Sequence, residues 1–133
     1  MVGETNLTTL LSSMSPVLLD DEYVFCSVPG GQYGDYQRLS PLATFRESEG
    51  LTLVLTKTAA LEGGLSFESV FKGITLTVHS SLDAVGLTAA VANKLTEKGI
   101  SANVIAAYYH DHIFVQTEKA ALAIEALNEF SNL

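Results

Sequence analysis

The stretch HSSLDAVGLTAAVANKLTEKGIS, from His79 to Ser101, decides the fold class of this chain. Its pattern is typical of a strand end, a turn, a helix and the start of a further strand. Leu87, Val91 and Leu95 recur at helical spacing and give the helix one apolar face. We therefore expect an amphipathic helix over residues 84–98.

Both ends of this helix carry residues that commonly cap helices. Asp83 is expected to accept hydrogen bonds from first-turn N–H groups, and Gly99 suits the position after the last turn. Leu82 and Leu87 occupy the two positions of a hydrophobic staple. Gly86 then lies inside the first turn, where glycine costs roughly 1 kcal/mol relative to alanine. Valine at this position is accordingly expected to leave the fold largely intact.

The elements expected around this helix match most of a known fold. Residues 74–79 alternate as a half-buried strand, and residues 100–117 predict two strands joined by a tight turn at His110 and Asp111. Residues 118–130 predict a second amphipathic helix on Leu122, Ile124, Leu127 and Phe130. Strand, helix, strand, strand, helix is the order of an α+β, ferredoxin-like fold with both helices on one face of an antiparallel sheet. Its fourth strand must come from another part of the chain.

The amino-terminal half is expected to contain short elements. The apolar spacing in residues 4–16 predicts a short helix that ends at Pro16. Two apolar runs around Asp20 and Asp21 predict a hairpin over residues 17–28. The remaining predictions are a loop over residues 29–41, a hairpin over 43–56 that turns at Glu49 and Gly50, and one or two helical turns over 57–62.

Composition limits the class of protein. The chain has 133 residues, of which 47% are apolar, so it can bury a core without disulfides. The single cysteine, Cys26, lies in an apolar run, which favours a reducing cytoplasm. No apolar run approaches the roughly 20 residues that span a bilayer. A formal charge of −8, with seven scattered Lys and Arg residues, argues against nucleic acid as a partner.

The helix and its flanks resemble a known family. The stretch DAVGLTAAVANKLTEKGISANVI, residues 83–105, is similar to ACT domains, which are small regulatory modules that bind amino acids. The shared features are an acidic residue that opens the helix, a glycine, the apolar stripe, a glycine stop and a strand with an asparagine. The resemblance implies a regulatory protein that binds an amino acid or a similar small carboxylate.

The resemblance extends over nearly the whole chain. The stretches MSPVLLDDEYVFCSV (14–28), TFRESEGLTLVL (44–55) and YYHDHIFV (108–115) are similar to a bacterial family of unknown physiological role with two tandem ACT-like units. This implies two units that lie side by side or interlock, as in the regulatory region of aspartokinases. We expect the units at residues 1–64 and 65–133, with a strand from 65–79 that either unit can take.

The resemblance also implies a ligand site where the first turn of the helix faces the sheet of a neighbouring unit. A helix amino terminus offers N–H groups and partial positive charge to a carboxylate, and Gly86 lets the carboxylate approach. Close packing of a neighbouring strand is the alternative reason for this glycine. If Asp83 caps the helix, it competes for the same N–H groups or turns toward the ligand's ammonium. The ligand-binding residues expected from the resemblance are Ser81, Asp83, Ala84, Val85, Gly86, Leu87, Asn103, Val104 and Ile105.

Histidines raise the alternative of a metal site. His110 and His112 flank Asp111, and His79 is the third histidine of the chain. A structural zinc site takes four ligands, and no further Cys or His completes a tetrahedral set here. We therefore expect no metal and no cofactor, with Asp111 forming the turn of the hairpin.

Polar residues of the amino-terminal half have plain explanations. Arg46 suits a ligand carboxylate, but a surface ion pair with Glu47 or Asp35 is the expected arrangement. The two tyrosines of GGQYGDYQ, Tyr33 and Tyr36, either cover a pocket or pack on the adjacent sheet.

An enzyme and a pure interaction module are the rival classes. An acylphosphatase-like enzyme needs an arginine in a phosphate-binding loop before the helix, but SSLDAVGL (80–87) occupies that place. Its aspartate would repel a phosphate, so we expect no catalysis. Ile105, Ala107 and Tyr109 make one face of their strand apolar, which favours a homodimer. A ligand screen separates a sensor from an interaction module that binds no ligand.

Overall fold

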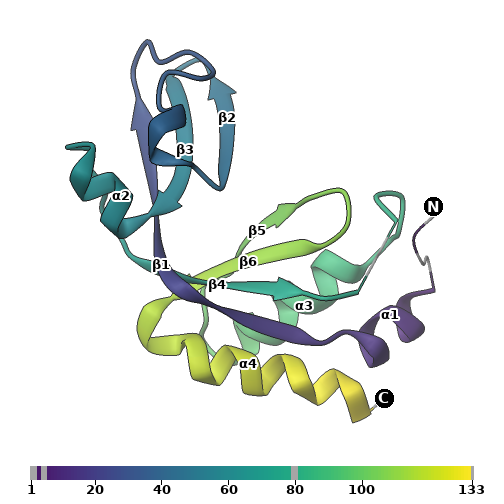
Figure 1. Ribbon diagram of the computed structural model, residues 1–133. Helices are drawn as coiled ribbons and strands as arrows, with labels where there is room; N and C mark the ends of the chain where they lie inside the picture. The colour runs from purple at the N-terminus through teal and green to yellow at the C-terminus, as the bar shows by residue number, and fades with distance from the viewer. Residues whose placement is uncertain (1–2, 4–5, 79–80, 133) are drawn as a thin grey trace. The chain divides into compact units, whose positions relative to one another are not determined.

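The computed structural model of the chain has an α+β fold with antiparallel strands and short helices, and it describes residues 3, 6–78 and 81–132 (Figure 1). Two compact units form: unit 1 comprises residues 1–20 and 72–133, and unit 2 comprises residues 21–71. The elements are α1 (Leu7–Ser13), β1 (Pro16–Val28), η1 (Gln37–Leu39), β2 (Ala43–Glu47), β3 (Gly50–Thr56), α2 (Lys57–Glu62), β4 (Phe71–Leu76), α3 (Leu87–Glu97), β5 (Asn103–Ala106), β6 (Asp111–Gln116), η2 (Thr117–Lys119), α4 (Ala120–Asn128) and η3 (Glu129–Asn132), where η marks a 3₁₀ helix.

The sheet of unit 1 has the strand order β1-β4-β6-β5. Thr77 N donates to Ser15 O at 2.9 Å, and Lys72 Nζ donates to Asp20 O at 2.7 Å, so the start of β1 lies antiparallel to β4. The amino-terminal segment thus supplies the fourth strand that the ferredoxin-like plan requires. The two units are therefore not separated at residue 64 of the sequence, because α1 and the first residues of β1 pack with the carboxyl-terminal half.

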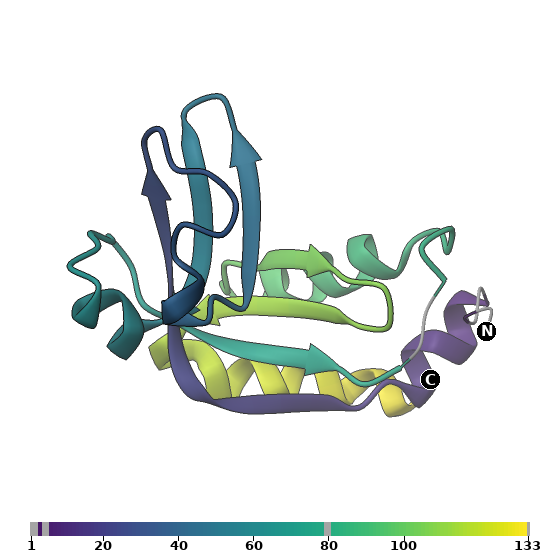
Figure 2. The same cartoon turned by 45° about the horizontal axis from the view of Figure 1, so that its top comes forward.

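The core of unit 1 lies on the sheet face that α3 and α4 cover (Figures 1 and 2). The predicted stripe of α3 is confirmed, since Leu87, Val91 and Leu95 are at most 4% exposed. The stripe predicted for the last helix is partly wrong, because Leu122 is 37% exposed. Alanines face the core instead, and their small side chains let α4 approach the sheet. The buried residues of this helix are Ala120, Ala123, Ala126 and Leu127.

Glycines mark both ends of α3. Gly86 has φ +98° and is the residue before the helix, so the prediction that Asp83 caps a helix starting at residue 84 is wrong. The predicted staple is not formed either, because Leu82 is 65% exposed. The predicted stop at Gly99 is confirmed: Gly99 has φ +73°, and Ile100 N donates back to Leu95 O at 3.0 Å. This bond and its companion, from Gly99 N to Thr96 O at 3.0 Å, form a Schellman motif.

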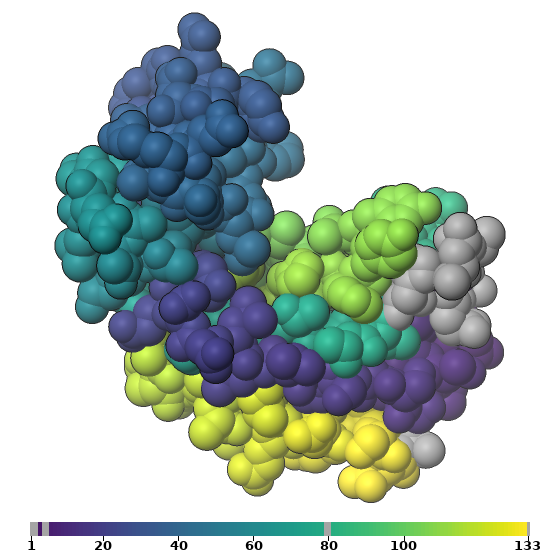
Figure 3. All heavy atoms as spheres, viewed as in Figure 1, coloured from purple at the N-terminus to yellow at the C-terminus, as the bar shows by residue number. Residues whose placement is uncertain are grey.

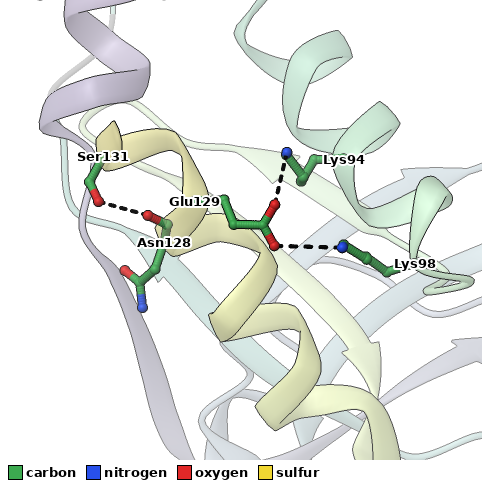
Figure 4. Close-up of polar contacts among 5 residues, drawn as sticks. All are labelled: Lys94, Lys98, Asn128, Glu129 and Ser131. Carbon is green, nitrogen blue, oxygen red and sulfur yellow. Dashed lines mark hydrogen bonds and ion pairs between the residues drawn. The ribbon is translucent and has the colours of Figure 1, made fainter. Parts of the chain in front are cut away.

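The last turn of α3 is also tied to the end of α4 (Figure 4). Lys94 Nζ lies 3.3 Å from one carboxylate oxygen of Glu129, and Lys98 Nζ lies 3.6 Å from the other. Lys94 Nζ also sits 5.2 Å from the centre of the Phe130 ring. The carboxyl end of α3 is therefore held by backbone and side-chain contacts.

Unit 2 has the sheet order β2-β3-β1. The predicted hairpin of β2 and β3 is confirmed, but its turn lies one residue earlier than predicted: Glu47 pairs with Gly50, so the turn residues are Ser48 and Glu49. The hairpin predicted around Asp20 and Asp21 is wrong, because β1 runs unbroken through both residues. Its first residues pair with β4 and its last with β3, so a change of partner takes the place of the expected turn.

The core of unit 2 lies between its sheet, α2 and the segment that follows β1. Leu51, Leu53 and Leu55 share one face of β3 and are at most 1% exposed, as their alternation predicts. Ala60 of α2 packs against them, and Tyr36 and Leu39 from the segment after β1 cover the same cluster.

Candidate functional site

The segment between β4 and α3 forms a turn organised by Ser81. Asp83 N donates to Ser81 Oγ at 3.1 Å, and Ala84 N donates to Ser81 O at 3.0 Å. Val85 is 84% exposed, and the chain then reverses at Gly86. An L-residue rarely adopts the positive φ of Gly86, so this glycine is required by the backbone conformation.

The amino end of α3 lacks a side-chain cap. Gly86 has no side chain, and no described residue supplies a capping hydrogen bond in its place. The first backbone bond of the helix runs from Ala90 N to Gly86 O at 2.9 Å. The N–H groups of the three preceding residues therefore point out of the helix end, where the helix dipole places partial positive charge. The expected competition between Asp83 and a ligand carboxylate does not arise here.

A cavity of about 60 Å³ opens at this helix end. It lies within unit 1, between the turn before α3 and the adjoining ends of β5 and β6. Among the residues expected at this helix end, Ser81, Ala84 and Leu87 line the cavity, whereas Asp83, Val85 and Gly86 do not. The full lining is Ser81, Leu82, Ala84, Leu87, Thr88, Ala106 and Asp111.

Asp111 is the residue of this cavity that sequence reasoning missed. It begins β6, pairs with Ala106 and is only 7% exposed, so the prediction that it forms the turn is wrong. Tyr108 and Tyr109 occupy the tip instead, closed by a bond from Ala107 N to His110 O at 3.1 Å. The available signal was alternation, because Asp111 falls in step with the buried residues Ile113 and Val115.

Burial governs the electrostatics of Asp111. Loss of solvation raises the pKa of its carboxyl above the usual value, and the nearby charges of His112 and His110 partly oppose that rise. Burial likewise lowers the pKa of His112, with a further reduction from His110, while Asp111 acts in the opposite direction. A cationic group in the cavity would therefore stabilise the ionised form of Asp111, which burial disfavours.

The three residues expected from β5 lie apart from the cavity. Asn103 pairs with Phe114, and its Nδ2 donates to Phe114 O at 3.2 Å. Asn103 and Ala106 stand at opposite ends of β5, roughly 10 Å apart along the strand. Val104 packs toward the core, and Ile105 pairs with His112. Unit 1 therefore does not bring Asn103 to the amino end of α3.

Two other classes of site are not found in the described part of the chain. His112 Nδ1 is 3.0 Å from Thr75 Oγ1, and His110 Nδ1 donates to Val78 O at 3.4 Å. Within residues 6–78 and 81–132, no three His, Cys, Asp or Glu side chains gather as a metal site. His79 lies outside the described residues. Of the helices described, none combines the length and apolar character needed to cross a membrane.

Comparison with known families accounts for both halves of the chain. ACT-domain family models match residues 2–72 and, in a second form, residues 68–129. The chain belongs to the ACT-domain family. The two matches lie in tandem and together span nearly all residues, as the resemblance of the sequence implies. Membership of this family supports a regulatory role. No significant match is found among curated proteins.

Solved structures give the same fold. A Vibrio cholerae protein of unknown function, described as a possible transport protein, is 62% identical, with 94% of this chain and 95% of that chain covered and a TM-score of 0.86. An Agrobacterium tumefaciens protein is 13% identical over 89% of each chain, with a TM-score of 0.73. The regulatory subunit of aspartate kinase from Thermus flavus is 11% identical over 87% of this chain and 96% of that chain, with a TM-score of 0.63.

Proposed function

We propose that this ACT protein is a non-catalytic sensor that binds a free amino acid at the amino end of α3. The observation that carries the proposal is one cavity with a helix end that lacks a side-chain cap and a buried carboxyl group, that of Asp111. The helix end attracts the α-carboxylate of the ligand, and Asp111 attracts its ammonium. An amino acid carries both groups on one carbon atom.

The cavity accounts for only part of such a site. Its volume of about 60 Å³ corresponds to roughly two water molecules at about 30 Å³ each. It therefore accommodates the charged groups of an amino acid, while the ligand's side chain extends outward. We propose that a second copy of the chain, in a homodimer, supplies the remaining contacts, with Asn103 contributing from the partner's β5. The apolar side chains of Ile105 on β5 and of Tyr109 at the tip of the β5–β6 hairpin support the dimer.

The only cysteine has no role in this proposal. Cys26 is 4% exposed, and burial raises the pKa of its thiol, which makes it a poor nucleophile. An inert, reduced thiol agrees with the proposed cytoplasmic location.

The test is a thermal-shift screen with the proteinogenic amino acids, followed by calorimetric titration of those that stabilise the protein. A ligand at a hundred times its Kd adds about 2.7 kcal/mol to the free energy of unfolding. Asp111→Asn should weaken binding roughly tenfold or more, because it removes a charged hydrogen-bond acceptor. Asp83→Asn is the matched control, since Asp83 is exposed and does not line the cavity. Equal loss in both variants, or no binding of any amino acid, contradicts the proposal.

An interaction module is the second candidate, favoured by the tip of the β5–β6 hairpin. Tyr108 and Tyr109 are 61% and 60% exposed there, and their rings meet edge to face at 5.0 Å. Exposed aromatic pairs are common at protein interfaces. Stabilisation of the isolated protein by an amino acid would favour the sensor over the interaction module.

A further inference from the structure

Unit 2 contains a groove that the proposed amino-acid site does not use. It has a volume of about 540 Å³, within the usual range of small-molecule sites. One wall comes from the segment between β1 and β2, which passes in front of β3 in both ribbon views. Its lining residues are Tyr33, Gly34, Tyr36, Gln37, Ser40, Pro41 and Leu42. Leu51 and Leu53 of β3 form the base. In Figure 3 the dark blue atoms of this segment lie on the face of unit 2 that is turned toward the viewer.

The groove continues toward an arginine at the edge of the sheet. A neighbouring hollow of about 340 Å³ shares Tyr33 and Thr44 with the groove and adds Phe45 and Arg46. Thr44 pairs with Leu53 and Arg46 pairs with Leu51, so both side chains of β2 belong to the sheet face on which the groove lies. The groove and the hollow thus adjoin at Tyr33 and Thr44, which places Arg46 beside the groove.

Arg46 is not neutralised by the carboxylates nearest to it in the sequence. The predicted ion pairs with Glu47 and Asp35 are not formed. Thr52 Oγ1 donates to Glu47 Oε1 at 2.6 Å, on the opposite face of the hairpin, and Gln32 N donates to Asp35 Oδ2 at 2.9 Å. None of the described residues that line the groove or the hollow is acidic. Arg46 is thus the one charged residue among those that line the groove and the hollow, in a chain of net charge −8.

We infer that this groove is a second binding site, for a small aromatic carboxylate that lacks an ammonium group. The carboxylate pairs with Arg46, whose guanidinium matches it with two parallel hydrogen bonds. The ring covers Tyr33 and Leu42, which are 79% and 51% exposed and so gain from burial. A zwitterionic amino acid is disfavoured, because the lining offers its ammonium no anionic partner and burying an unpaired charge is costly.

The wall of the groove is already ordered by its own backbone. Gln37 N donates to Gly34 O at 3.2 Å, and Ser40 N donates to Gln37 O at 3.0 Å. The guanidinium carbon of Arg38 lies 5.7 Å from the centre of the Tyr36 ring, a further contact within this segment. A ligand therefore meets a preformed wall and does not have to order it, which lowers the entropic cost of binding.

The test is titration with benzoate, phenylacetate and indole-3-acetate, followed by backbone amide NMR and calorimetry. We expect saturable shifts confined to residues 33–46 and 51–53. Benzamide and phenylacetamide, which match the first two ligands in shape but carry no charge, should bind roughly tenfold more weakly or worse. Equal binding of acid and amide, or no saturable shift with any acid, would overturn the inference without any variant being needed.

Variants then locate the charge. Arg46→Gln should weaken benzoate binding roughly tenfold or more. Lys119→Gln removes the same charge from unit 1 and should leave the affinity within about twofold. Asp111→Asn, which disables the proposed amino-acid site, should leave benzoate binding unchanged. The two proposed sites can therefore be tested independently of each other. Unaltered binding by Arg46→Gln contradicts the inference. The inference is also contradicted if the same amide shifts appear when the protein is concentrated without ligand. That result would show that the groove is a contact between two copies of the chain.

Discussion

Two helices of this chain begin in opposite ways. At the start of α2, Thr56 Oγ1 accepts a hydrogen bond from Ala59 N at 3.1 Å. At the start of α3, Gly86 provides no side chain, and no described residue takes its place. Replacing a threonine cap by alanine commonly costs about 1 kcal/mol, whereas glycine at the same position costs only a few tenths, so α3 loses little stability by beginning at a glycine. The first N–H groups of α3 therefore have no side-chain partner among the described residues, as at the start of α4, and the proposed amino-acid site uses those of α3.

Gly86→Val should give the largest effect on stability. Valine at φ +98° is strained, and a Cβ there would lie 3.1 Å from Leu7 Cδ2 of α1. We expect a loss of about 2 kcal/mol or more in the free energy of unfolding without ligand, by chemical denaturation. This replaces the sequence-based expectation that the variant folds normally. An unchanged stability would contradict the left-handed conformation of Gly86.

A second glycine separates the two parts of that loss. Gly64 also has positive φ, at +68°, but a Cβ there meets nothing within 4 Å. Gly64→Ala should therefore report the backbone cost alone, about 1 kcal/mol. Gly86→Ala should cost more, by the amount needed to displace Leu7. Equal losses would show that the contact with α1 is unimportant.

Thr56→Ala should give the next largest effect, and it tests the start of α2, the helix that has a side-chain cap. Removing the hydroxyl leaves Ala59 N without its acceptor, and we expect a loss of about 1 kcal/mol, again by chemical denaturation. The affinity for an amino acid should not change, because Thr56 belongs to unit 2 and does not line the cavity at α3. An altered affinity would count against the proposed division of roles.

Local patterns predicted most elements of this fold. The stripe of α3, the alternation of β3 and the glycine at the end of α3 depend on neighbours in the sequence, and all three predictions are confirmed. The unbroken β1 was missed because its two halves pair with strands that lie far away in the sequence. Asp20 and Asp21 are exposed charges within a strand, and sequence alone does not distinguish this from a turn.

The candidate site was predicted less completely, for two physical reasons. Asp83 has the chemistry of a cap, but the positive φ of Gly86 moves the start of the helix beyond its reach. Asp111 was assigned to a turn because aspartate is common in turns, although its register places it among buried residues. Ser81, Ala84 and Leu87 were found because they lie within one short segment.

The pH dependence of stability should reveal the buried carboxyl at the open helix end. Burial raises the folded-state pKa of Asp111, so its ionised form is disfavoured in the fold. Stability is therefore fully present below the unfolded pKa, near 3.9, and declines as pH rises through the higher folded pKa. Asp111→Asn should be more stable than the wild type above this window and equal to it below. A wild-type advantage at neutral pH would contradict the direction of the shift.

Ligand binding should depend on the same group with the opposite sign. If the ligand's ammonium pairs with ionised Asp111, affinity should increase as pH rises through the folded pKa. Calorimetric titration at several pH values measures this, and Asp111→Asn should remove the dependence. A flat profile in the wild type would place the ammonium elsewhere.

Glu129→Gln should give the smallest effect, and it tests the closed end of α3. Glu129 pairs with Lys94 and Lys98, and the hydrogen bond from Lys94 is the main cause of its lowered pKa. A lowered pKa means that the pair contributes above the unfolded pKa of glutamate and is lost as pH falls through the folded value.

Glu129 and Lys98 are exposed and Lys94 is half-buried, so the contribution of these ion pairs should be small and should fade at high salt. Thermal melts at low and high salt, for wild type and Glu129→Gln, measure it. Because the Schellman bonds at Gly99 do not involve Glu129, the end of α3 should stay formed in the variant. Amino-acid affinity should also persist, since the pair lies at the opposite end of α3 from the cavity. A large loss of affinity in Glu129→Gln would show that the two ends of α3 are coupled, and the contrast between a closed and an open end would no longer hold.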